Sequence, residues 1–81
     1  MSTYTLEAAG ALFAKVEAMS TERALAFNEF AMKEIECVGY AVNDSSEVAG
    51  NVVQGCFEVT DSRDEQWGLF EKLLNEFESA I

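Results

Sequence analysis

Histidine and proline are absent from this chain, and lysine and arginine are scarce. Five basic residues stand against fifteen aspartate and glutamate residues, so the formal net charge is −10 over 81 residues. Without histidine, the chain lacks the commonest general base and a usual zinc ligand. The acid excess repels nucleic acid and anionic membranes and favours a basic partner surface. We therefore expect a basic protein as partner, with no direct nucleic-acid binding and no membrane binding.

Long apolar runs and cysteine pairs are missing as well. No stretch approaches the roughly 18 consecutive apolar residues of a membrane-spanning helix, and the first residues lack the basic start of a signal peptide. A cytoplasmic location follows as the expectation. Cys37 and Cys56 form no C-x-x-C motif, so we expect two free, buried thiols and no metal site. A disulfide between helices is the alternative.

The size of the chain predicts a single domain over residues 1–81. Apolar residues make up 49% of the sequence, which is ample for a core and argues against disorder despite the charge. A domain this small buries only about 60% of its unfolded surface. A homodimer would stabilise such a domain, so self-association is a possible second role for its apolar side chains.

Apolar residues recur at helical steps of three and four along the first half of the chain. This spacing predicts one helix over 5–19, capped by Thr5, and a second over 21–41, capped by Thr21. Gly39 either ends the second helix or is tolerated inside it. The two stripes consist of Leu6, Ala9, Leu12, Phe13, Val16 and Met19, and then of Ala24, Phe27, Ala31, Ile35 and Val38.

Residues 43–60 carry conflicting signals. Valine, phenylalanine and threonine favour a strand by propensity, and each of two glycines would cost a helix about 1 kcal/mol. Apolar residues nevertheless fall in pairs repeated every four positions, whereas a strand would need alternation. Asp44-x-x-Glu47 also resembles a capping box. The pattern favours a helix over 45–59.

The last segment, 62–80, has a clear helical pattern that begins with the capping box Ser62-x-x-Glu65. Its apolar stripe consists of Trp67, Phe70, Leu73, Leu74, Phe77 and Ile81. A shift of 40 positions also places part of the first half on the second, for example Ala9 and Gly10 on Ala49 and Gly50. This weak echo indicates either two related helical hairpins or chance.

The sequence thus predicts an all-α fold, a small four-helix domain made of two helical hairpins whose neighbouring helices pack antiparallel. The alternative is an α+β fold with a short β-hairpin within 39–60, formed by 39–43 and 52–60, before the last helix.

An enzyme is not expected, because no basic side chain is placed to activate a serine, threonine or cysteine. The three acids at Asp61, Asp64 and Glu65 also fail the calcium-loop pattern, since the sixth position holds Gln66 and the twelfth Lys72. We expect no catalytic residue, no cofactor and no metal.

Acidic residues recur every seven positions on the second and last predicted helices, so each series stays near one helix face. The candidate partner-binding residues are Glu22, Glu29, Glu36, Asp64, Glu65, Glu71, Glu76 and Glu78. Acids at helical spacing lie about 5–6 Å apart, loosely comparable to phosphates along a nucleic-acid strand. A solvated face charged for solubility would look the same.

Two functional hypotheses follow. The first is an acidic inhibitor that mimics nucleic acid on a basic partner surface. Small acidic phage counter-defence proteins, such as anti-restriction and anti-CRISPR proteins, are analogous in size and charge alone. Such proteins act in the host cytoplasm. The second is a helical structural or regulatory module that dimerises or docks a partner helix through aromatic residues such as Phe27, Phe30 or Trp67. Adaptation to high salt is a third explanation of the acidity.

Overall fold

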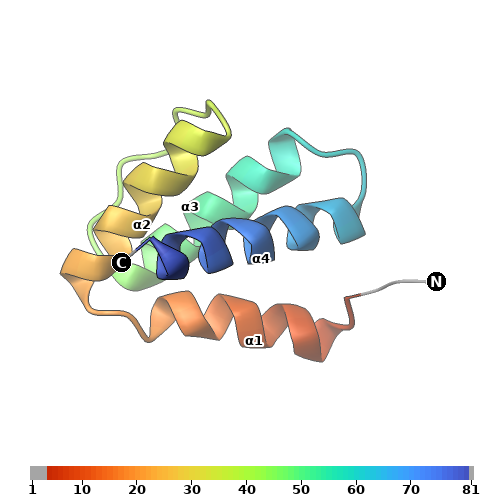
Figure 1. The fold of residues 1–81 in the computed structure, drawn as a ribbon, viewed down its shortest axis with the longest axis horizontal. Coiled ribbons are helices and arrows are strands. Elements are labelled where there is room, and N and C mark those ends of the chain that lie inside the picture. Colours follow the sequence, from red (N-terminus) through yellow and green to blue (C-terminus); the bar gives the residue numbers. More distant parts are fainter. Residues whose placement is uncertain (1–3, 81) are drawn as a thin grey trace.

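The computed structural model describes residues 4–80, which form four α-helices and contain no strand in that range (Figure 1). The helices are α1 (Leu6–Glu17), α2 (Thr21–Glu34), α3 (Ser45–Glu58) and α4 (Arg63–Ser79). The predicted all-α fold is confirmed. The α+β alternative is wrong, because α3 occupies most of the segment that would have formed the hairpin. Ile81 of the last predicted stripe lies outside the described residues.

Each helix begins at a side-chain cap that accepts a hydrogen bond from the backbone N–H three residues later. The caps are Thr5, Ser20, Asp44 and Ser62, with donor–acceptor distances of 3.0, 3.2, 2.9 and 3.2 Å. The expectation that Thr21 caps the second helix is wrong. Ser20 has the extended backbone of an N-cap, and its hydroxyl accepts from Arg23 N–H, so Thr21 is already helical.

The second helix ends at Glu34 rather than at the predicted residue 41. Cys37 N–H donates to the Met32 carbonyl at 2.9 Å and Glu36 N–H to the Lys33 carbonyl at 3.3 Å, which together form a Schellman C-cap. Glu36 takes the left-handed conformation of this motif, with φ of 53°, although glycine normally occupies it. The helix therefore ends before Gly39, which belongs to the segment that follows.

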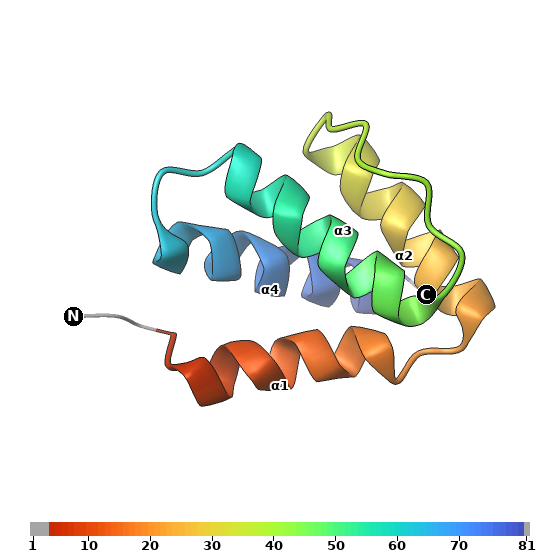
Figure 2. The ribbon, with the colours of Figure 1, turned by 180° about the vertical axis from the view of Figure 1, so that it is seen from behind.

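Residues 37–43, which we call the strap, run back along α3 and make α2 and α3 parallel (Figure 2). Three contacts trace this path: Cys37 Sγ to Glu58 Oε2 at 3.5 Å, Tyr40 N–H to Asn51 Oδ1 at 2.7 Å, and Asn43 N–H to Glu47 Oε1 at 2.7 Å. Asn51 also donates to Asn28 Oδ1 at 2.7 Å, which ties α3 to α2. The expected antiparallel packing of all neighbours does not hold for this pair.

The α3 helix lies at the centre of the domain and packs against each of the other three helices. It forms the expected antiparallel hairpin with α4, where Gln66 Nε2 donates to the Val53 carbonyl at 3.0 Å. The first two helices make little contact with each other, because α1 packs on α3 and α4 instead (Figure 1). Both segments that the 40-residue shift superimposes on each other are thus helical. Their packing differs, because α3 and α4 form a hairpin whereas α1 and α2 barely touch.

An aromatic seam of Phe27, Phe30, Trp67, Phe70 and Phe77 joins α2 to α4. The Phe27 ring lies 6.2 Å from the Phe70 ring and 5.3 Å from the Phe77 ring, measured between centroids. Phe27 and Phe70 are fully buried, while the other three rings are half-buried at the edge of the core. Such pairs contribute about 0.5–1.5 kcal/mol beyond the burial of their area.

Candidate functional site

The acids of α2 lie on its solvent side. Glu22 and Glu29 are exposed and point away from buried Phe27, which faces α4. They are seven residues apart, about 10 Å along the helix axis. Glu36 is exposed too, but it follows the end of the helix and does not extend this row. Exposed Lys33 lies one turn beyond Glu29, so this face carries charge of both signs.

The acids of α4 divide into two groups. Glu65, Glu76 and Glu78 are exposed, and exposed Lys72 lies one turn before Glu76. Asp64 and Glu71 are half-buried and bind the N-terminal segment at Tyr4. The Asp64–Glu71–Glu78 series is therefore partly engaged inside the molecule.

The hydrogen bond between Tyr4 and Glu71 is short and raises the pKa of the Tyr4 hydroxyl. The Tyr4 hydroxyl donates to Glu71 Oε1 at 2.6 Å, and Tyr4 N–H donates to Asp64 Oδ1 at 3.4 Å. The hydrogen bond to Glu71, partial burial and the negative charges of Glu71 and Asp64 raise the pKa of Tyr4 above 10.0. These two carboxylates thus hold Tyr4 against α4.

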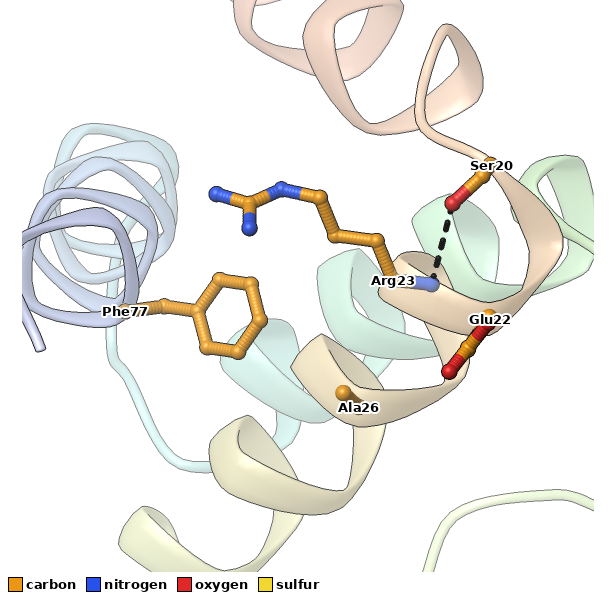
Figure 3. A pocket seen from close by; sticks show the side chains of 5 residues that line it. All are labelled: Ser20, Glu22, Arg23, Ala26 and Phe77. Carbon is orange, nitrogen blue, oxygen red and sulfur yellow. Dashed lines mark hydrogen bonds between the residues drawn. The ribbon is translucent and has the colours of Figure 1, made fainter. Parts of the chain in front are cut away.

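The two helices that carry the predicted acids do meet, but through the aromatic seam rather than through carboxylates. The Arg23 guanidinium lies over the Phe77 ring, 5.0 Å from its centroid (Figure 3). A shallow depression of about 400 Å³ surrounds this pair and is also lined by Ser20, Glu22 and Ala26. Arg23 is half-buried there, so one of the few cations serves packing.

A further acidic surface, which the seven-residue series does not reveal, surrounds the strap. Residues 34–62 contain no lysine or arginine and six acids: Glu34, Glu36, Asp44, Glu47, Glu58 and Asp61. The strap contacts place Glu58 at one end and Glu47 at the other, with Val38 and Tyr40 between them. Val38 is 95% exposed and Tyr40 67% exposed. The cation-free stretch of sequence was the signal that could have identified this surface.

The cysteines and the acids form no recognisable reactive centre. Both cysteines are free; Cys56 is buried, as expected, and Cys37 is half-buried. Burial, followed by the nearby Cys37, raises the pKa of the Cys56 thiol to about 12, which suppresses its nucleophilic thiolate form. Among residues 4–80, no group of three or more cysteine, aspartate or glutamate side chains is arranged to hold a metal ion.

Comparison of the chain with protein-family models, with curated proteins and with solved structures found no match. Within residues 4–80, no helix is both long and apolar enough to cross a membrane. The functional argument therefore depends on the surface itself.

Proposed function

We propose that this protein is a non-enzymatic acidic binding protein that docks on the basic surface with which a partner protein binds nucleic acid. The observation that supports this proposal is the placement of the acids. Thirteen of the fifteen aspartate and glutamate side chains are exposed on a folded helical domain. A fixed array of carboxylates occupies a groove lined by lysine and arginine and excludes the nucleic acid that normally binds there.

Charge complementarity gives the proposed complex two measurable properties. Long-range attraction accelerates association, and added salt screens it. Five candidate acids on the helices are exposed and contribute to this field: Glu22, Glu29, Glu65, Glu76 and Glu78. Inhibition of nucleic-acid-binding machinery in the cytoplasm, as phage counter-defence proteins do in their hosts, is the activity that this chemistry suits.

The test begins with capture of partners by the immobilised protein and elution along a salt gradient. The proposal expects a basic nucleic-acid-binding protein that is released by salt and displaced by duplex DNA or by RNA. Replacing Glu22, Glu29, Glu65 and Glu76 together by lysine should weaken that complex strongly, whereas replacing them by glutamine should weaken it less. A complex that survives about 1 M salt, where the Debye length is about 3 Å, would contradict the proposal.

A second candidate function, apolar dimerisation or docking of a partner helix, is favoured by the large apolar side chains that remain exposed. Leu6, Val38, Tyr40 and Phe57 are 80%, 95%, 67% and 61% exposed. A complex of this kind persists at high salt and is sensitive to apolar-to-polar substitution rather than to charge reversal. The mass of the protein in solution at low and high salt separates self-association from binding of a charged partner.

A further inference from the structure

We infer that the strap and the adjoining edge of α3 are the contact surface, and that this surface takes a partner segment with lysine or arginine on both sides of an apolar centre. The inference rests on the proposed function and adds the location and the chemistry of the partner. The strap face is defined by Glu36, Val38, Tyr40, Asp44, Glu47 and Glu58.

The centre of the strap face is apolar. Val38 and Tyr40 lie two positions apart in the strap. They are the most exposed large apolar side chains between α2 and α3. Tyrosine is enriched among the residues that dominate binding energy, because its ring buries a large area at low entropic cost. A partner must therefore offer apolar side chains at this centre.

The ends of the strap face are acidic. Glu58 contacts Cys37 at one end of the strap, and Glu47 contacts Asn43 at the other. These two acids are eleven residues apart on α3, which corresponds to about 16 Å. The stretch 34–62, which contains both acids, has no lysine or arginine, so the two acids fit basic side chains at both ends of a bound segment.

A hydrogen bond to the buried side chain of Asn51 ties the strap to α3. Asn51 is only 3% exposed, and its side chain accepts from Tyr40 N–H and donates to Asn28. Gly39 has φ of 67°, and a Cβ there would lie 2.7 Å from both Asn51 side-chain polar atoms. A preorganised surface loses less conformational entropy on binding than a flexible loop.

Glu36 supplies an independent observation. It occupies the left-handed position at the end of α2, where glycine would relieve the strain on the backbone. Strain that persists at an exposed position is more easily explained by a role for the side chain than by folding. Glu36 is exposed and directly precedes Cys37, whose thiol contacts Glu58 at that end of the strap face.

The same charges decide between possible occupants. A second copy of this chain would bring an identical acidic face against the strap face, and like charges across an interface are unfavourable. Nucleic acid and anionic lipid are repelled for the same reason. A basic, partly apolar protein segment is the occupant whose chemistry complements both parts of the surface.

The test uses the full chain, labelled for NMR, and two synthetic peptides of equal charge. Both carry lysines at each end; one has leucine and tyrosine at its centre, and the control has serine there. We expect the apolar peptide to bind at least about tenfold more tightly than the serine peptide, a difference of about 1.4 kcal/mol. Amide shifts should be concentrated in 36–47 and near Glu58, and they should weaken with added salt.

Matched variants locate the site. Tyr40→Ala should reduce affinity for the apolar peptide by about tenfold, whereas Phe57→Ala, similarly exposed but lining a depression beside Arg63, should not. The double variant Glu47→Gln with Glu58→Gln should weaken binding more than Glu65→Gln with Glu76→Gln. Glutamine keeps an acceptor for the Asn43 and Cys37 contacts, so the strap remains in place.

Two further variants guard against a loss of folding. Val38→Ser changes a side chain that is 95% exposed and should weaken binding without lowering the thermal midpoint. Glu36→Gly should raise the thermal midpoint and lower peptide affinity. If both glutamine pairs weaken binding equally, or if the two peptides bind alike, the strap inference fails while the proposed function stands. If neither peptide shows salt-sensitive binding, both fail.

Discussion

The aromatic seam and the strap join segments of this protein in opposite ways. In the seam, rings of α2 and α4 pack edge to face and exclude water around fully buried Phe27 and Phe70. In the strap, one buried amide, Asn51, fixes an irregular segment whose own apolar side chains remain exposed. The seam uses its apolar residues for stability, whereas the strap displays them.

This difference shows how a small domain combines a stable core with an open surface. Packing of the seam gains free energy from every buried ring, roughly in proportion to the apolar area removed from water. A polar tether gains much less, because its hydrogen bonds replace bonds to water, but its geometry is specific. The following predictions test whether the two regions can be disturbed separately.

Phe27→Ala should have the largest effect, because it removes a ring at the centre of the seam. Deleting a buried phenylalanine costs about 3–5 kcal/mol, and a domain has only about 5–15 kcal/mol in total. We expect urea unfolding to show a variant near or beyond the limit of stability. Phe57→Ala removes a ring that is 61% exposed and serves as the control. Equal losses in the two variants would contradict the central role of the seam.

Asn51→Ala should have an intermediate effect that is confined to the strap. The substitution leaves the Tyr40 N–H and the Asn28 side chain without their partner, which costs about 1–3 kcal/mol. We expect faster hydrogen exchange at Tyr40 while the helical circular dichroism is retained. Asn28→Ala, which removes the acceptor of Asn51 Nδ2 but leaves the bond from Tyr40 N–H to Asn51 Oδ1, is the matched control. A cooperative loss of all four helices would show that the strap and the core are not separable.

The seam, but not the strap, was accessible from the sequence. Apolar spacing identified all four helices, and Thr5, Asp44 and Ser62 identified three starts, because periodicity and caps are local signals. The end of α2 was missed because Val38 and Val42 continue the apolar spacing past a Schellman cap built on a glutamate. That cap is made by hydrogen bonds from Glu36 and Cys37 back to Lys33 and Met32, which apolar spacing does not report.

The candidate acids illustrate the same limit. Seven-residue spacing places Glu22 and Glu29 near one face of α2, yet it cannot reveal that Tyr4 reaches Asp64 and Glu71, which lie 60 and 67 positions further along the chain. It also passes over the acids of the strap face, which come from an irregular segment and α3. A count of basic residues along the chain, falling to zero over 34–62, carries that information without any assumption about helices.

The smallest effect is expected at the N-terminal contact, where Tyr4→Phe removes the hydroxyl that donates to Glu71. This partly exposed hydrogen bond contributes only about 0.5–1 kcal/mol. Because the folded state raises the pKa of Tyr4 above 10.0, the contribution is full below the unfolded pKa and is lost as the pH rises through the folded pKa.

Urea unfolding of the native chain and of Tyr4→Phe measures this contribution as a difference between two proteins. The difference should be present at about pH 8 and shrink above about pH 11, since free tyrosine ionises near 10. Tyr40→Phe, which alters a side chain that is 67% exposed, is the control and should change stability little at either pH. A Tyr4 difference that stayed constant across this range would mean that the hydroxyl does not bond to Glu71 in solution, which would leave the Glu71 carboxylate available to a partner.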